Sequence, residues 1–378
     1  MGQPKKIFDF IALSEQPVFQ KTILVLVFCA FFSVTSMANH STTSHGMSSN
    51  TSHSVTEKSG EPTKYDPGKM IMDHVTDAHD WHLWGEGQDA VSLPLPIILY
   101  SSSKGIVCFS SSKFHHGHEA FDGFMINEKG GIQWADENNK EAIIDLSITK
   151  NVLAMILGVL TLGFIVTGMA MSYGKNKGRA PKGFHNLVEP LILFIRDDVA
   201  RASIPKSKAD KYLPLLLSIF FFIFTLNLFG LIPIFPGGAN VTGNIAITMV
   251  LAVIVFLTVN LSANKYYWKH IFLPDVPVWM YVIIIPIEIL GVVLKPFVLM
   301  LRLFANITAG HIIILGFFSL IFIFGAMKPG LGYAVSPLSV AFTVFMSLLE
   351  LLVAFLQAFV FTLLTAIYIG SAVEEHHH

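Results

Sequence analysis

Long apolar runs dominate the second half of the chain. Uncharged runs at 150–173 (after its first residue), 212–233 and 243–261 have the length of about 20 residues that a helix needs to cross ~30 Å of hydrocarbon. Two later runs, 276–327 and 333–370, are longer, since the second alone would reach ~57 Å as a helix. They are predicted to be strongly tilted or broken, and the sequence KPGLG at 328–332 joins them. The pattern predicts about five transmembrane helices.

Charged residues between these runs predict the topology. Residues 183–204 mix apolar and charged positions, which favours a helix in the membrane interface rather than a span. Positive residues are concentrated in the loops after the first and third runs and before the second, and such residues mark the cytoplasmic side. They are Lys175, Lys177, Arg179, Lys182, Lys206, Lys208, Lys211, Lys265 and Lys269. The first span is therefore expected to run inward, with the preceding region outside.

The first 38 residues have the pattern of a signal peptide. Two lysines precede an apolar core at 22–34, and Ser36-Met37-Ala38 offers small residues for cleavage. The long segment before the core also contains Asp9 and Glu15, which leaves an uncleaved anchor as the alternative.

Residues 39–147 form a polar, His-rich region that is expected to be exported. Up to about residue 67 it is rich in Ser, Thr, His and Gly, which is typical of a flexible lead-in. The short runs 95–100, 105–110 and 131–135 alternate with turn residues and predict a small β-rich module. Its histidines lack the ligand spacing of a structural zinc site, so no metal is expected. The predicted fold class is thus an all-α polytopic membrane protein with about five transmembrane helices and an interfacial helix. The last two transmembrane helices are expected to be long and tilted, and a small β-rich or partly disordered exported region precedes the membrane part.

Composition agrees with a membrane protein. The 378 residues are 53% hydrophobic and 13% charged, against about 25% charged residues in a soluble globular chain. The formal net charge of −1 and the scattered basic residues give no reason to expect a nucleic-acid partner. The lipid bilayer is the partner that composition predicts.

Polar residues inside the two long runs follow a pattern. At 100° per residue, Glu288, Lys295, Arg302 and Asn306 lie within roughly 40° of one another on one helix face, and His311 lies on the opposite face. In the last run, the polar residues that share a face are Glu350 and Gln357. Folding the two helices antiparallel about KPGLG brings Gln357 level with Arg302, and Glu350 level with His311.

Simpler interpretations compete with a functional one. A single polar residue in a span often serves helix packing, and Lys295 could extend its amine to the interface. Arg302 is different, because a guanidinium stays charged and costs at least about 3 kcal/mol at mid-bilayer. No acid of this chain is expected at its depth, which suggests a partner in another protein. A secondary transporter would show repeated halves and a metallohydrolase HEXXH, and neither pattern is found.

Specific motifs resemble subunit a of the bacterial F-type ATP synthase. They are KPFVLML followed by RLFANITAGH at 295–311, LQAFVFTLLTAIYI at 356–369, NLFGLIP at 227–233 and NVTGNIAIT at 240–248. The resemblance covers residues 183–378 and implies that Arg302 is the family's essential arginine, with Asn306 and Gln357 as polar neighbours and Glu288 on the exit path. Many bacterial members have an acid where this chain has His311 and a histidine where it has Glu350. The resemblance implies that the exchanged residues preserve one His/Glu pair in the outer half-channel.

The resemblance also implies a mechanism and partners. Residues 148–378 would be a stator domain with two offset proton half-channels, beside a rotating ring of small hairpin subunits that each carry a carboxylate. Peripheral-stalk subunit b would be a second partner. The chain would be a non-catalytic subunit with no cofactor, in the bacterial inner membrane, with a periplasmic N-terminal region and a cytoplasmic C-terminus. The alternative function is a proton-coupled secondary transporter.

Overall fold

The computed structural model describes residues 66–374, apart from 85–90, 118, 128–129, 137, 140, 176–182, 184, 233–234, 236 and 275. The predicted signal peptide and most of the flexible lead-in lie outside the described residues. The described chain forms two compact units. We call residues 151–308 with 350–374 the arginine unit, and residues 66–150 with 309–349 the β unit. Within the β unit, residues 66–150 are the β module.

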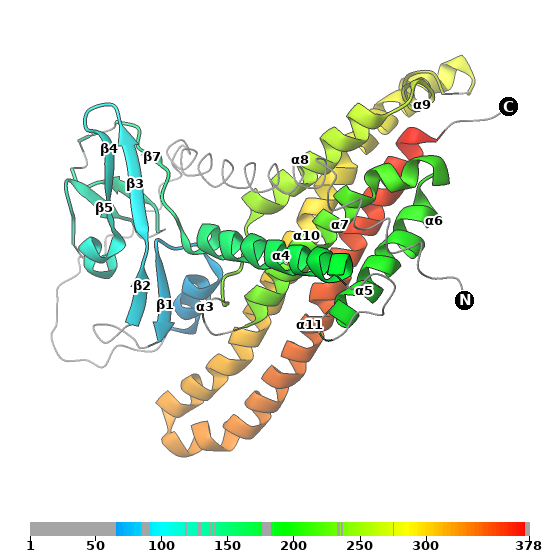
Figure 1. Ribbon diagram of the computed structural model, residues 1–378. Helices are drawn as coiled ribbons and strands as arrows, with labels where there is room; N and C mark the ends of the chain where they lie inside the picture. The colour runs from blue at the N-terminus through cyan, green and yellow to red at the C-terminus, as the bar shows by residue number, and fades with distance from the viewer. Residues whose placement is uncertain are drawn as a thin grey trace. The chain divides into compact units, whose positions relative to one another are not determined.

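Five helices are long and apolar enough, by length and composition, to cross a membrane (Figure 1). This result confirms the predicted number of spans. The helices are α4 (Lys150–Lys175), α7 (Lys206–Leu231), α8 (Ile245–Ser262), α10 (Tyr281–Met327) and α11 (Pro329–Val373). Asn244 caps α8, because its side-chain oxygen accepts a hydrogen bond of 3.0 Å from the backbone N–H of Ala246.

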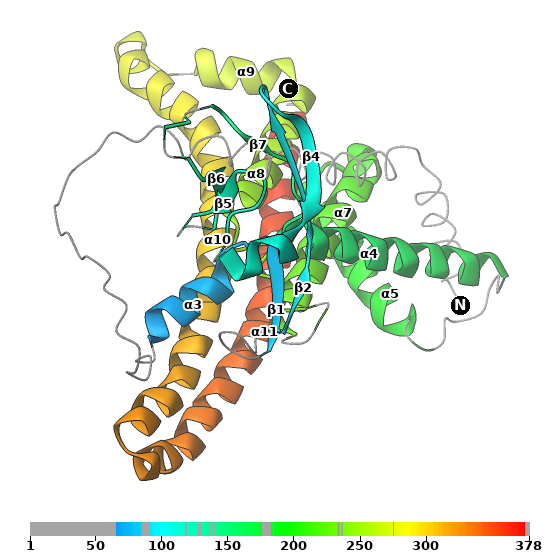
Figure 2. The same ribbon diagram turned by 90° about the vertical axis from the view of Figure 1, so that its left-hand side faces the viewer.

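Helices α10 and α11 are continuous, so the alternative of two broken helices is wrong. They contain 47 and 45 residues, although Pro286, Pro296 and Pro337 lie within them. Their connection is shorter than the predicted KPGLG turn, because only Lys328 separates the two helices. Gly332 allows this sharp turn: a Cβ added there would lie 2.8 Å from the Cα of Gly325. The hairpin end is visible in both views (Figure 2).

The segment that was predicted to form an interfacial helix is helical, in three pieces. They are α5 (His185–Phe194), the π-helical segment η4 (Ile195–Ala200) and α6 (Arg201–Ser203). Arg196 forms an ion pair of 2.8 Å with Asp197, and Arg201 bridges Asp197 and Asp210 at 3.2 and 3.1 Å. The Arg201–Asp210 ion pair joins this segment to α7, and the pairs with Asp197 lie within the segment. Two short helices that the sequence reasoning did not predict follow α8: α9 (Lys265–Phe272) and the single 3-10 turn η5 (Val278–Met280).

The β module contains small antiparallel sheets, as the sequence predicts. The predicted runs become strands β3, β4 and β6, and β3 lies between β4 and β7. Its elements are α3 (Pro67–Val75), β1 (Asp80–Trp84), β2 (Val91–Pro94), β3 (Pro96–Ser101), β4 (Gly105–Ser110), the 3-10 helix η3 (Ser111–Gly117), β5 (Phe124–Ile126), β6 (Ile132–Trp134) and β7 (Ile144–Asp145). Gly105 adopts a positive φ of 70° at the end of the β3–β4 turn.

A compact apolar core supports these sheets. Ile97, Leu99, Phe114 and Phe124 are fully buried, and the rings of Phe124 and Trp134 stack at 4.6 Å between centroids. The alternation of buried and exposed side chains along β3 places Ile97 and Leu99 on this core. The β module therefore has its own hydrophobic core, although its sequence is mostly polar.

Candidate functional site

Helix α10 has two different faces around Arg302. The apolar side chains of one face are almost fully buried against the rest of the chain, and the other face is exposed. The buried residues are Leu299, Met300, Leu303 and Ile307. The exposed residues are Val298, Leu301, Arg302, Ala305, Asn306 and Ala309. Arg302 and Asn306 are one turn apart and thus lie together on the exposed face, which we call the open face of α10.

Arg302 has no carboxylate partner within the described part of the chain. The ion pairs among the described residues lie in the β module and in the interfacial segment around Arg196 and Arg201. Because a guanidinium remains charged in a membrane, its compensating charge must come from outside this set of residues. An open face with small residues next to Arg302 can admit another helix at close range.

Helix α11 carries its candidate residues on a buried face. Glu350 is 4% exposed and Gln357 is 9% exposed, although several neighbouring leucine side chains are exposed. Both polar side chains therefore point into protein rather than toward the helix surface that Leu348, Leu352 and Leu356 expose.

Asn227 of α7 and the loop before α8 form hydrogen bonds that hold both helices near these residues. Asn227 Nδ2 donates to the backbone oxygen of Ala354 at 3.2 Å, and Thr242 Oγ1 donates to Asn227 Oδ1 at 2.7 Å. Thr308 Oγ1 donates to the backbone oxygen of Gly243 at 3.4 Å. The NLFGLIP and NVTGNIAIT motifs thereby bind α11 between Glu350 and Gln357, and α10 two residues after Asn306.

A second polar group lies closer to the N-terminal end of α10, near Glu288. Lys295 Nζ lies 5.6 Å above the ring of Tyr368, and both line a small pocket with Tyr267 and Asn260. Burial, and in addition the negative charge of Glu288, raises the pKa of Tyr267 on α9. Glu288 is partly exposed. The contact with Tyr368 shows that the Lys295 amine is held within the chain rather than extended away from it.

Comparisons with known proteins show the family of the region that contains this site. A family model described as ATP synthase A chain matches residues 152–370. An "ATP synthase subunit a" from Chloroherpeton thalassium is 44% identical over 240 residues, which are 62% of this chain and 69% of that protein. One from Chlorobium phaeobacteroides is 45% identical over 240 residues (61% and 68%), and one from Myxococcus xanthus is 39% identical over 244 residues (63% and 77%). The chain belongs to the ATP synthase A chain family.

The β module has a match of its own. A second family model, described as Domain of unknown function (DUF8433), matches residues 70–152. This range ends where the match to the ATP synthase A chain family begins. The β module thus has the sequence pattern of a defined domain with no assigned role.

The pairing of His311 with Glu350, which the family resemblance implies, remains a prediction. His311 is a partly exposed residue of α10 in the β unit, and Glu350 is a buried residue of α11 in the arginine unit. Their contact across the two units stays a prediction. Within the described residues, no group of three or more His, Cys, Asp or Glu side chains gathers as metal ligands would.

The sequence analysis did not predict the contacts of several residues around the site. Asn227, Thr242 and Thr308 were visible only as parts of motifs, and their hydrogen bonds depend on contacts between distant segments. The aromatic residues Tyr267 and Tyr368 gave no signal, since tyrosine is common near membrane interfaces.

Proposed function

We propose that Arg302 faces the ionised carboxylates of a rotating ring in the ATP synthase. The observation that carries this proposal is the position of Arg302 on the open face of α10, without a carboxylate among the described residues. A ring carboxylate is stable in a low-dielectric membrane only when a positive charge compensates it. Arg302 supplies that charge and cannot itself carry the transported proton.

Family membership gives the setting. The chain is a proton-translocating stator subunit of an F-type ATP synthase, it acts with other subunits of that complex, and it is a multi-pass membrane protein. A proton-coupled secondary transporter is not favoured by this membership. We propose further that the chain is non-catalytic, that the ring consists of small hairpin subunits with one carboxylate each, and that peripheral-stalk subunit b is a second partner.

The proposed proton path has two half-channels. Protons enter through His311 and Glu350, neutralise a ring carboxylate that leaves Arg302, travel with the ring through lipid and leave near Glu288. Asn306 and Gln357 lie beside Arg302 along the path. The small pocket on the Glu288 side of Arg302 supports the exit side, since it gathers the polar groups of Tyr267, Lys295 and Tyr368 in an otherwise apolar lining.

The proposed orientation follows the positive residues. The region 39–147 is periplasmic, the domain 148–378 lies in the bacterial inner membrane, and the C-terminus is cytoplasmic. Residues 1–38 act as the export signal. The meeting of the two family matches at residue 152 supports a domain boundary near residue 148.

A photoreactive amino acid at Leu301 should report the ring directly. Leu301 is 38% exposed on the open face next to Arg302, so illumination is expected to link it to a small, very apolar subunit that carries a carboxylate. The same probe at Phe164 on α4, which is 79% exposed, is the control and should give no such adduct. Mass spectrometry of the purified complex identifies the adduct. An equal yield of the ring adduct from both positions, or none from Leu301, would contradict the proposal.

Thiol labelling tests the orientation. Cys108 is an exposed free cysteine of strand β4. It is expected to react with a membrane-impermeant maleimide added to intact cells whose outer membrane is permeabilised, whereas a cysteine introduced by Lys177→Cys should react only in inverted vesicles. A Cys108→Ser background provides the control for the second position. Labelling of both positions from one side would show that the topology is wrong.

A further inference from the structure

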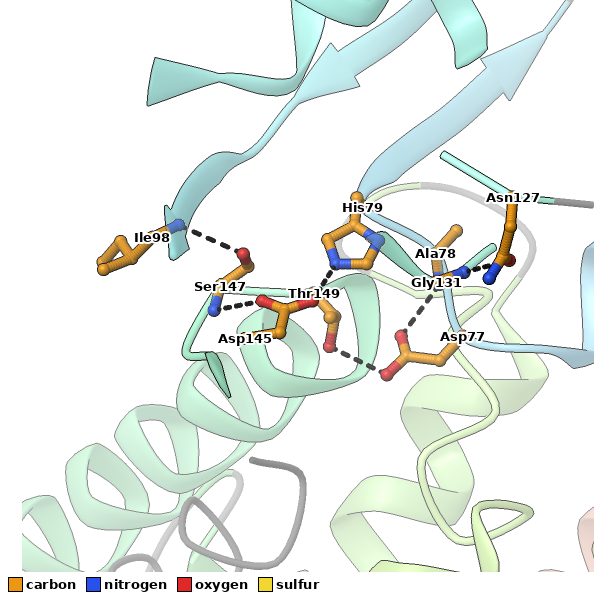
Figure 3. Close-up of polar contacts among 9 residues, drawn as sticks. All are labelled: Asp77, Ala78, His79, Ile98, Asn127, Gly131, Asp145, Ser147 and Thr149. Atoms are coloured by element: carbon orange, nitrogen blue, oxygen red, sulfur yellow. Dashed lines mark hydrogen bonds and ion pairs between the residues drawn. The ribbon is translucent and has the colours of Figure 1, made fainter. Parts of the chain in front are cut away.

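A buried polar cluster in the β module serves the fold of that module (Figure 3). His79 Nε2 lies 2.8 Å from Asp145 Oδ2, and Thr149 Oγ1 donates to Asp77 Oδ2 at 2.8 Å. Asp145 Oδ1 accepts a further hydrogen bond of 2.9 Å from the backbone N–H of Ser147. These contacts fasten the segment after α3 to β7 and to the start of α4. The surface of the arginine unit offers a group of side chains of a different kind.

The outer surface of α9 carries exposed aromatic and basic side chains. Its three exposed rings are 37–52% exposed, and two of them stack with 6.0 Å between their centroids. Its two lysines are four residues apart and thus share one side of the helix, and neither forms an ion pair with a described residue. We define the α9 surface as these five residues, Lys265, Tyr266, Trp268, Lys269 and Phe272.

The contacts of Asn264 place α9 at the level where two spanning helices end. Helix α8 ends at Ser262, and the backbone N–H of Asn264 donates to the oxygen of Ala372 at 2.8 Å. Asn264 Nδ2 also donates at 2.8 Å to the oxygen of Val373, the last residue of α11. Because spanning helices end where the hydrocarbon ends, α9 lies at a surface of the membrane.

The residue types of the α9 surface match phospholipid headgroups. Tryptophan and tyrosine favour the membrane interface, where the ring is in apolar surroundings and its polar group stays in water. A lysine beside a span is attracted by the negative surface potential of anionic lipids. Residues 261–274 contain no Asp or Glu, so no acid of this segment opposes that attraction. Charge complementarity therefore favours anionic over neutral phospholipids.

We propose that the α9 surface binds the headgroups of anionic phospholipids. Lys265 and Lys269 contact the lipid phosphates, and the three aromatic rings lie between the headgroups and the beginning of the acyl chains. Through Asn264, the bound lipids hold the ends of α8 and α11 at a fixed depth in the membrane. The site is independent of the proposed proton path, because none of its five residues belongs to that path.

A photoreactive amino acid in place of Tyr266 tests which molecule covers the α9 surface. The purified complex is placed in nanodiscs with equal amounts of phosphatidylglycerol, which is anionic, and phosphatidylcholine, which has no net charge. After illumination, mass spectrometry is expected to find severalfold more adduct with phosphatidylglycerol. The same probe at Phe164, an exposed residue of α4, is the control and should capture both lipids in similar amounts through their acyl chains. Equal yields of the two lipids at residue 266, or a protein subunit as the main adduct there, would overturn the proposal.

Removing the two positive charges tests the role of the lysines. In the double variant Lys265→Gln with Lys269→Gln, the ratio of the two lipid adducts at residue 266 should fall to that of the Phe164 control. Glutamine has nearly the same helix propensity as lysine, so α9 is expected to stay helical. The matched control, Lys265→Arg with Lys269→Arg, keeps both charges and should keep the native ratio. A native ratio in the glutamine variant, at equal amounts of assembled complex, would show that these lysines do not select the lipid.

Discussion

Replacing Arg302 by alanine is expected to abolish coupled proton transport while the complex still assembles. An ionised carboxylate that must pass this point without compensation costs several kcal/mol. Since about 1.4 kcal/mol corresponds to a factor of ten in rate, proton-driven ATP synthesis should fall by more than about 100-fold. Assembly should persist, because Arg302 is exposed on α10 and forms no ion pair with a carboxylate among the described residues. The measurement is ATP synthesis in inverted vesicles, normalised to the assembled complex.

Two further variants separate charge from shape at this position. Arg302→Lys keeps the charge but loses the planar guanidinium, so only a small recovery is expected. Leu301→Ala removes the neighbouring exposed side chain of the same open face and should retain most of the activity. Normal coupled synthesis by Arg302→Ala would refute the proposed role of Arg302. A loss of assembly in Arg302→Ala, but not in Leu301→Ala, would instead assign the guanidinium to the fold.

The membrane helices could be predicted from sequence because their signal is local. A run such as 243–261 needs only its own residues to satisfy its backbone hydrogen bonds, and the observed α8 begins within two residues of it. The strands β3 and β4 were predictable for a similar reason, since a turn of three residues, 102–104, followed by Gly105 joins two apolar runs. Helix α9 was missed because its eight residues mix aromatic and basic side chains, a pattern that also suits a loop at the interface.

The positions of the candidate site residues were predictable where they lie on one helix face. Arg302 and Asn306 lie on one exposed face, as the 100° spacing implies. Contacts between distant segments could not be read in this way. Asn227 and Ala354 are 127 residues apart, and His79 and Asp145 are 66 residues apart. Such pairs depend on how the chain folds back on itself, and a single sequence contains no direct signal for them.

The hydrogen bonds of Asn227, Thr242 and Thr308 explain how the open face of α10 can remain accurately positioned. Among the described residues, no element covers the open face of α10 around Arg302. Side-chain packing therefore holds this part of α10 from its buried face only. Thr308 connects α10 to Gly243, and Asn227 of α7 connects α11 to Thr242, which is the neighbour of Gly243 in the loop before α8. Hydrogen bonds between membrane helices contribute about 0.6 kcal/mol each on average, so their value here lies in registration more than in stability.

Exchanging His311 and Glu350 is expected to restore activity that either single change removes. If the two residues form one proton relay, each needs the other: an imidazole and a carboxylate can pass a proton between them and compensate each other's charge. His311→Glu alone places two acids together, and two carboxylates cannot both ionise at close range without a large cost. Glu350→His alone pairs two imidazoles and removes the compensating negative charge. Each single variant should therefore slow proton-driven ATP synthesis.

The double variant, His311→Glu with Glu350→His, should recover a substantial part of the native rate. Non-additivity of this kind, with a coupling energy of about 0.5–3 kcal/mol, is expected only for residues in contact or in one network. A matched control combines His311→Glu with Gln357→His, which introduces a histidine on the same face of α11 two turns away. This control should recover nothing, because the new imidazole lies ~10 Å further along the helix. If the exchanged pair is no faster than the slower single variant at equal assembly, the facing-pair model of the outer half-channel is wrong, whereas the role of Arg302 is unaffected.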